Sequence, residues 1–245
     1  MVKKFTTYDE IENLCEAMVK DFMKRKHYTN VNCVDIEAFV REYLGIPIVY
    51  ECFAEPDPGR IGFVSDGVRP LYVKKDGVRS QVLFPKDTIV IDRFLLGPKE
   101  IARKRFTLAH EAAHIILARH VPNQTNLAAA FHSEFDGEMQ YDDAMLREMM
   151  SVNELFCNRI AACLLMPKFL VERNIRKCSP DLVFYCYDNY IVDQNQKLLM
   201  QRVADRMGTS YTAFFNRLKE LNLFVQKPIE SYVHETLGFG GEFYD

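Results

Sequence analysis

Residues 106–114 read Phe-Thr-Leu-Ala-His-Glu-Ala-Ala-His and contain the motif His-Glu-x-x-His. His110 and His114 are four residues apart, so on an α-helix their imidazoles lie on one face, one turn apart. Two imidazoles placed in this way can bind one metal ion. Glu111 lies about 100° further round the helix, beside the ion but not bound to it, where a general base belongs. The stretch therefore predicts a helix that carries most of a metal-dependent site.

The neighbouring sequence supports a helix at this position. Gly97-Pro98 precedes the stretch, and proline suits a first helical position, while Pro122 follows its end. Three titratable groups would be costly to bury without a partner in such an apolar segment, which favours a metal over two solvated histidines and a glutamate. An apolar stripe would seat the helix on a core; its residues are Ile101, Ala109, Ala113 and Ile116.

The composition describes a folded chain. With 245 residues, 48% of them hydrophobic, the chain can form one substantial domain and a smaller module. The formal net charge of −3 predicts no general affinity for nucleic acid or anionic membranes. No apolar run approaches the ~20 residues of a membrane span, and Met1-Val-Lys-Lys leads into a polar segment rather than a signal peptide.

The seven cysteines show no paired spacing, which predicts buried thiols in a reducing cytoplasm. Cys157 and Cys163 are expected in the core as small hydrophobic residues. Because the chain contains no Cys-x-x-Cys pair, a cysteine zinc site is not expected.

The apolar periodicity predicts an α+β fold in two parts. We expect a small, largely antiparallel sheet that leads into the metal-site helix, with turns at Asp66-Gly67 and Asp76-Gly77. A zincin-like domain is expected over residues 1–172, and a helix-turn-helix-like helical module with a C-terminal tail over residues 173–245. The expected helices cover residues 11–22 and 34–43, and the expected strands residues 46–53, 61–64, 71–73, 81–84 and 88–91.

Residues 121–150 interrupt this pattern and are acidic. We expect them to form an inserted loop or short helix at the rim of the site. Helical periodicity returns over residues 144–165 and ends at Met166-Pro167. The acidic residues, set against Arg147 alone, are Glu134, Asp136, Glu138, Asp142, Asp143 and Glu148.

A catalytic zinc site needs a third protein ligand. His120 has the spacing of a known motif in which glycine breaks the helix after the second histidine, but here that position is Leu117 and the helix would carry His120 away from His114. Glu154 on the following helix is the better candidate. The alternative for Glu154 is a capping box with Ser151, in which the carboxylate satisfies a backbone donor.

Asn158 lies one helical turn after Glu154. It is placed to orient a metal ligand through a hydrogen bond. The alternative is an asparagine that faces solvent.

Several motifs together resemble the ImmA/IrrE family of metallopeptidases, over most of residues 8–224. The resemblance implies that His110, His114 and Glu154 bind Zn2+, with Mn2+ also compatible with this ligand set, and that Glu111 is the catalytic carboxylate. The acidic segment is longer than the usual connection in the family. The matching motifs are the stretch from Arg105 to His114, Glu154-Leu-Phe-Cys-Asn158, Ala161-Ala-Cys-Leu-Leu-Met-Pro167, the strand Thr88-Ile-Val-Ile-Asp92, and the pattern from Val34 to Ile46.

The resemblance extends to residues 201–219, where a turn at Gly208 and an N-cap at Ser210 separate two helices. A DNA-binding interpretation would use Tyr211, Thr212, Asn216 and Lys219. We favour a structural helix pair, because residues 194–224 carry only five basic and two acidic side chains. No nucleic-acid-binding residue is assigned.

The predicted function is that of a cytoplasmic zinc endopeptidase. The resemblance implies that its protein substrate is a helix-turn-helix repressor, cut to relieve repression. The alternative is a DNA- or repressor-binding regulator whose metal site is structural or vestigial, and the intact Glu111 argues against it. Residues 225–245 show no helical period, and we expect them to be disordered.

Overall fold

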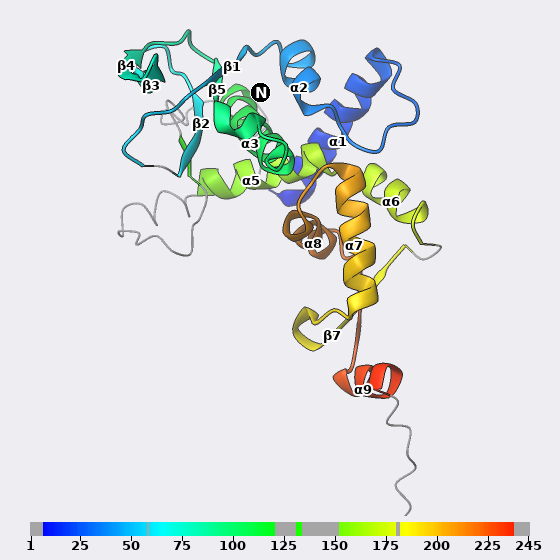
Figure 1. Cartoon of the computed structure of the whole chain (residues 1–245). Helices are drawn as coiled ribbons and strands as arrows, with labels where there is room; N and C mark the ends of the chain where they lie inside the picture. The colour runs from blue at the N-terminus through cyan, green and yellow to red at the C-terminus, as the bar shows by residue number, and fades with distance from the viewer. Residues whose placement is uncertain (1–6, 58, 121–130, 134–151, 180–181, 238–245) are drawn as a thin grey trace, which may run out of the picture. The chain divides into compact units, whose positions relative to one another are not determined.

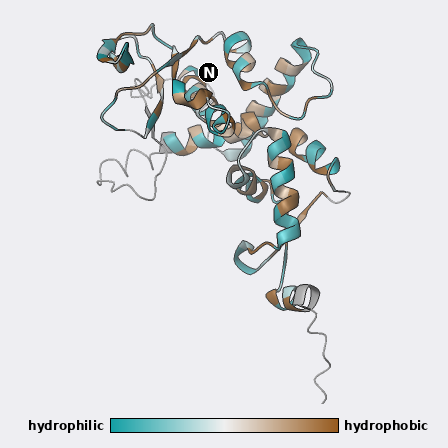
Figure 2. Ribbon diagram, in the orientation of Figure 1, coloured by the Kyte–Doolittle hydropathy of each residue, from teal (hydrophilic) through white to brown (hydrophobic). Residues whose placement is uncertain are grey.

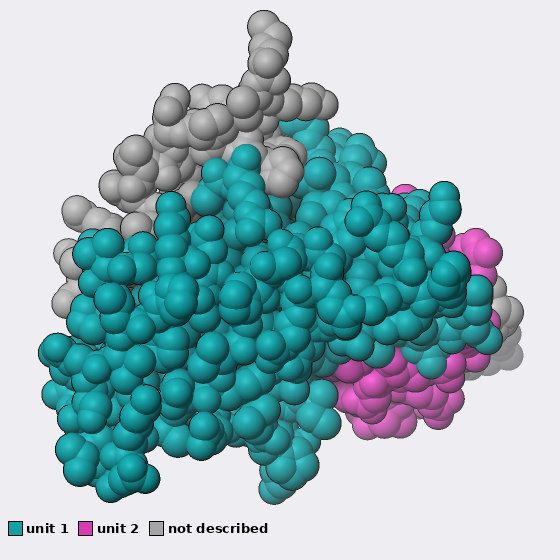
Figure 3. Space-filling model, turned by 90° about the horizontal axis from the view of Figure 1, so that it is seen from above, with its two compact units in different colours: residues 1–167 teal, residues 168–245 magenta. Residues whose placement is uncertain are grey.

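The computed structural model describes residues 7–57, 59–120, 131–133, 152–179 and 182–237 (Figure 1). The chain divides into two compact units, residues 1–167 and 168–245, coloured separately in Figure 3. The boundary expected at residue 172 falls inside helix α6 (Lys168–Arg176), which begins directly after Pro167. None of the helices within the described ranges is both long and apolar enough to cross a membrane.

The first unit begins with helices that form part of its core. Helix α1 (Tyr8–Arg25) is capped by Thr7, whose side chain accepts a hydrogen bond from the backbone of Glu10. A short helix α2 (Ile36–Ala38), capped by Asp35, continues into a π-helical turn, η1 (Phe39–Tyr43). The buried face of α1 consists of Ile11, Cys15, Val19, Phe22 and Met23.

The main sheet has four strands in the order β1-β5-β2-β6. Strands β1 (Ile48–Glu51) and β5 (Ile89–Asp92) are parallel, whereas β2 (Arg60–Val64) is antiparallel to β5 and β6 (Phe131–Ser133) is antiparallel to β2. The main sheet is largely antiparallel, as expected, and the β1–β5 pair is the parallel exception. The long connection between these strands provides the crossover that parallel pairing requires.

Strands β3 (Leu71–Lys75) and β4 (Val78–Val82) form a separate hairpin rather than part of the main sheet. Their loop is Asp76-Gly77, with φ values of 49° and 84°, as in the two-residue turns that match the twist of a hairpin. The hairpin packs on the main sheet through a buried cluster of Phe63, Leu71, Val73, Phe84 and Val90.

Helix α3 (Ile101–His120) packs against β2 and β5 on one side and against α5 (Val152–Leu165). The helix begins three residues later than Pro98. Gly97 ends the short 3₁₀ helix η2 (Arg93–Leu96), and the Gly97 carbonyl accepts a hydrogen bond from the backbone of Glu100 before α3 starts. Ile101 is consequently 55% exposed and does not belong to the predicted apolar stripe. The other three residues of that stripe are buried.

The predicted insertion, residues 121–150, is described only at residues 131–133. These form β6, a strand at the edge of the main sheet, instead of part of a loop or short helix. The acidic residues of the insertion and the first part of the helix predicted over residues 144–165 lie outside the described residues.

The second unit is not wholly helical, contrary to the prediction. It contains α6, η3 (Asp188–Tyr190), α7 (Gln194–Met207), α8 (Tyr211–Glu220) and α9 (Ile229–Leu237), but also a parallel pair of strands, β7 (Phe184–Tyr187) and β8 (Phe224–Lys227). The prediction of disorder over residues 225–245 is wrong for the part up to Leu237, which forms β8 and α9. Strand β8 has a backbone partner in β7, and α9 follows Pro228; residues 238–245 lie outside the described residues.

Helices α7 and α8 are joined by the turn expected from the sequence. Gly208 adopts a left-handed conformation with φ of 64° and ends α7, and the Ser210 side chain accepts a hydrogen bond from the backbone of Ala213 at the start of α8. Teal and brown alternate around α7 in Figure 2, as they should in a helix that is buried on one face. The buried face of α7 consists of Met200, Val203, Ala204 and Met207.

Candidate metal centre

Helix α3 presents the two histidines side by side in the interior of the first unit. His110 and His114 are 0% and 2% exposed, and their Nε2 atoms lie 3.1 Å apart. Small residues on this part of the helix, Ala109, Ala112 and Ala113, are also fully buried and let the helix lie close to its neighbours. The predicted pairing of the two imidazoles is therefore present in the structure.

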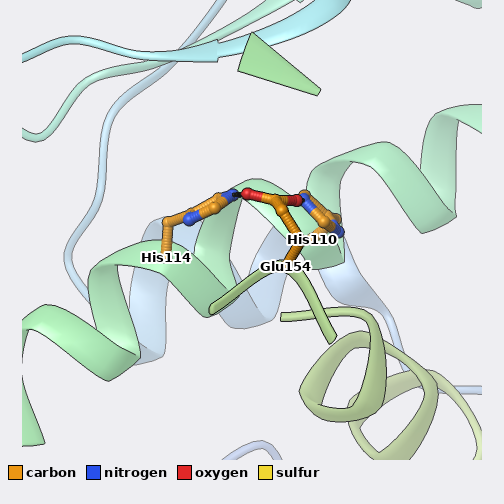
Figure 4. A group of neighbouring side chains, drawn as sticks. All are labelled: His110, His114 and Glu154. Carbon is orange, nitrogen blue, oxygen red and sulfur yellow. Dashed lines mark hydrogen bonds and ion pairs between the residues drawn. The ribbon is translucent and has the colours of Figure 1, made fainter. Parts of the chain in front are cut away.

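Glu154 reaches the same point from α5. Its Oε2 atom lies 3.1 Å from Nε2 of His110, and its Oε1 atom lies 3.5 Å from Nε2 of His114. In Figure 4 the carboxylate lies between the two imidazole rings. Ser151, the partner in the alternative capping box, lies outside the described residues, while the Glu154 carboxylate contacts the two histidines.

The outer nitrogen of each imidazole contacts a side chain of α5. Nδ1 of His110 lies 2.9 Å from Oδ1 of Asn158, and Nδ1 of His114 lies 3.2 Å from Sγ of Cys157. The Asn158 amide oxygen can only accept, so Nδ1 of His110 donates this hydrogen bond, and in the neutral ring Nε2 is the nitrogen that can bind a metal ion. Cys157 is fully buried, as expected from the sequence, but its contact with His114 was not predicted.

The electrostatics of the site favour the protonation states that bind metal. Burial, followed by the influence of His110, lowers the pKa of His114 to about 4. Burial opposes ionisation of Glu154, but the hydrogen bond to His110 and the charges of the two imidazoles outweigh it, and the pKa of Glu154 is lowered. Near neutral pH His114 is therefore neutral and Glu154 is a carboxylate.

These residues fit a divalent metal ion. The three ligand atoms all lie within 4.8 Å of one another. Tetrahedral coordination by nitrogen and oxygen at ~2.0–2.1 Å separates ligand atoms by about 3.3 Å. The two Nε2 atoms lie 3.1 Å apart, and each has a Glu154 oxygen near that distance, Oε2 at 3.1 Å from His110 and Oε1 at 3.5 Å from His114. Two imidazole nitrogens and a carboxylate that converge away from bulk water are a suitable ligand set for a divalent cation.

Glu111 and His120 lie on the same helix but outside this group of three. Glu111 is fully buried and its carboxylate faces strand β2 near Gly62. Helix α3 continues through Leu117 to His120 without a break, so the helix lacks the interruption that would return His120 to the metal.

Two imidazoles and a carboxylate that converge beside a further buried glutamate define a site of the metallopeptidase class. The model of a peptidase family described as the IrrE N-terminal-like domain matches residues 98–219. A stretch of 104 residues is 29% identical to the radiation response metalloprotease IrrE of Deinococcus deserti and covers 42% of this chain. The chain belongs to the ImmA/IrrE family, as its motifs predicted, although it spans only 31% of the length of that relative.

Proposed function

We propose that this protein is a zinc-dependent endopeptidase that cuts a helix-turn-helix repressor and so relieves repression. The observation that carries the proposal is the convergence of His110, His114 and Glu154 beside the buried Glu111. The membership of the family, and the similarity to a relative described as a metalloprotease, support the choice of a peptidase over other hydrolases.

The three ligands would hold the metal ion by Nε2 of each histidine and by the Glu154 carboxylate. A bound Zn2+ ion supplies Lewis-acid polarisation of a peptide carbonyl and lowers the pKa of a water molecule toward ~7. Mn2+ suits the same ligand set, and we propose zinc on the strength of the nitrogen-rich donors.

Glu111 acts as the general base. It accepts the proton of the attacking water molecule and passes it to the nitrogen of the leaving amine, so that no charged amine anion has to leave. Its position one residue after His110 holds it on the helix that binds the metal. Its burial excludes bulk water, which would weaken the electrostatic effect of the carboxylate.

The substrate chain would be held extended against the main sheet. A peptide can add a strand to a sheet edge through backbone hydrogen bonds, while side-chain pockets provide the specificity. The edge strands of the main sheet are β1 and β6, and β6 lies on the side of β2, the strand that faces Glu111. The family resemblance is what supports a repressor as the proposed substrate.

The second candidate function is a DNA- or repressor-binding regulator with a structural or vestigial metal site. The observation in its favour is the α7–α8 helix pair with its short turn. Against DNA binding, one of the basic residues of α8, Arg217, is fully buried and contacts Glu220 at 3.1 Å. A buried arginine does not contribute to a basic surface that could bind DNA. A purely structural metal site, in turn, does not need a general base such as Glu111.

The test compares the wild type with Glu111→Gln on a cognate helix-turn-helix repressor. Glu111 is not expected to bind the metal, so the variant should keep its fold, its zinc and its repressor binding. The rate of cleavage should fall by at least the ~10²-fold typical of acid–base groups. Fragments are followed by gel electrophoresis and mass spectrometry, with chelator-treated wild type as a second control.

The outcomes separate the two functions. An endopeptidase gives two fragments with the wild type, none with chelator and almost none with Glu111→Gln. If Glu111→Gln relieves repression in cells as well as the wild type does, proteolysis is not the mechanism and the binding regulator takes its place.

A further inference from the structure

Gly62 in strand β2 lies directly against the catalytic helix. A β-carbon added at this glycine would lie 2.5 Å from Oε1 of Glu111, 3.0 Å from its Cδ atom and 2.7 Å from Cγ2 of Thr107. Real side chains do not approach so closely, so the Glu111 carboxylate and the Thr107 methyl group occupy the space that any other residue at position 62 would fill. A glycine inside a strand often marks such a close approach.

The backbone conformation does not explain the glycine. Gly45, Gly67, Gly77 and Gly208 all have positive φ values, between 64° and 84°, and their turns require the left-handed region. Gly62 is not among the glycines with positive φ, so an alanine could adopt its backbone conformation. What Gly62 provides is space.

We propose that Gly62 is a positioning residue for the reaction: its missing side chain forms the seat that holds the Glu111 carboxylate in place beside the metal centre. The proposal rests on the proposed peptidase function, because it assigns Gly62 a role through the general base. Gly62 itself contacts neither the metal ligands nor the substrate in this role.

The groups around an added methyl group at position 62 are held in place, so most of them cannot move away from it. Strand β2 is paired on both sides at this position, with Ile91 of β5 and with His132 of β6, so it cannot move away from the helix without breaking the sheet. Thr107 is held by the hydrogen bond that its hydroxyl donates to the carbonyl of Arg103, at 3.0 Å. The carboxylate at the end of the Glu111 side chain is therefore the group that moves.

The first experiment measures Gly62→Ala in the repressor-cleavage assay. Displacement of the base should lower kcat by about 10²-fold, toward the value for Glu111→Gln, and leave KM unchanged. The metal content should stay at the wild-type value, because the atoms nearest to the new methyl group belong to Glu111 and Thr107 and not to the three ligands. An unchanged kcat, or a loss of metal that accounts for the loss of activity, would overturn the proposal.

The matched control is Gly97→Ala. Its added β-carbon would lie 3.2 Å from the carbonyl of Phe94 and 3.7 Å from Cγ of Glu100, away from Glu111. It tests whether an extra methyl group at a tightly packed glycine is enough to reduce activity. Wild-type kcat is expected, and a loss equal to that of Gly62→Ala would refute a specific role for Gly62.

A double-mutant cycle shows whether Gly62 acts through Glu111. In the Glu111→Gln background the base is already absent, so Gly62→Ala should cause little further loss of kcat. A second loss by the same factor would mean that Gly62 acts through another group, and the positioning role would be wrong.

A second cycle measures stability and does not depend on activity. Gly62→Ala should lower the melting temperature, and this cost should be smaller in the Glu111→Ala background, where the carboxylate is missing. An equal decrease in melting temperature in the wild-type and Glu111→Ala backgrounds would contradict the proposed contact between position 62 and the Glu111 carboxylate. If the coupling is found but the wild type cuts no repressor, the peptidase function fails, and with it the catalytic role of Gly62. Should Gly62→Ala prove insoluble, Gly62→Ala/Thr107→Ser removes the 2.7 Å contact and carries the same tests.

Discussion

The two units bury polar side chains in different ways. In residues 1–167, His110, His114 and Glu154 come from two helices and direct their nitrogen and oxygen atoms at one another. In residues 168–245, the buried Arg217 contacts Glu220 on its own helix. Asn174 likewise donates to the carbonyl of Leu170, one turn earlier on α6. A metal site requires convergence of ligands, and among the described residues the only such group of His, Cys, Asp or Glu side chains is that of the first unit.

The largest effects are expected at the metal ligands. His110→Ala or His114→Ala should abolish binding of about one divalent ion per chain, because two ligands do not form a stable site. Glu154→Gln should weaken binding without abolishing it, since the neutral amide oxygen is a poorer ligand. Metal content after dialysis and elemental analysis measures both effects.

Full metal content in Glu154→Gln would contradict the assignment of the third ligand. The capping box with Ser151 would then be the better explanation of Glu154. If His110→Ala or His114→Ala kept its metal, the histidines would not be ligands, and the first unit would no longer differ from the second by a metal site.

Smaller effects are expected where α5 contacts the outer nitrogens of the histidines. Asn158→Ala removes the acceptor for Nδ1 of His110, and the metal affinity should fall by about 10–100-fold. Cys157→Ala should cost less, because a thiol is a weak hydrogen-bonding partner. Competition with a chromophoric chelator measures both affinities, and Cys157→Ser serves as the conservative control.

The ranking of these two variants is the informative result. Burial and the nearby charge of Glu154 raise the pKa of the Cys157 thiol, so it remains neutral and does not compete for the metal as a thiolate. A larger loss of affinity in Cys157→Ala than in Asn158→Ala would mean that the sulfur has a more direct part in the site.

The smallest effects are expected on the exposed face of α8. Thr212→Ala and Asn216→Ala should change the free energy of unfolding by less than about 0.5 kcal/mol, because both side chains are exposed. Neither should create or remove sequence-specific DNA binding, measured by fluorescence anisotropy over a range of salt concentrations. Specific binding by the wild type that either variant abolishes would show that the second unit is more than a scaffold.

The sequence was most informative where the relevant residues are close together in the chain. His110, Glu111 and His114 share one helix, and helical periodicity relates their positions directly to one face. Glu154 was the better candidate for a third ligand on the following helix, the family resemblance supported that choice, and the structure places it against both histidines. The turn at Gly208 is also a local feature, since only a few residues determine it.

The missed features depend on pairing between distant segments. Strands β1 and β5 run parallel, β6 comes from the acidic insertion, and β8 has its partner in β7. Short strands carry little periodic signal, so a sequence pattern does not reveal which partner a strand will take. The contact of Gly62 with the general base was missed for the same reason, because it joins a strand to a helix far along the chain.

The division of the site between α3 and α5 has a consequence for how such a protein can evolve. Helix α3 carries both histidines and the proposed general base, Glu111, within five residues, so a shift of this helix would move the two proposed metal ligands and the base together. Helix α5 carries Glu154, Cys157 and Asn158, which touch the histidines without carrying the base. Substitutions on α5 can therefore change how tightly the ion is held while the catalytic carboxylate stays where it is. Affinity for the metal and speed of cleavage can be selected separately.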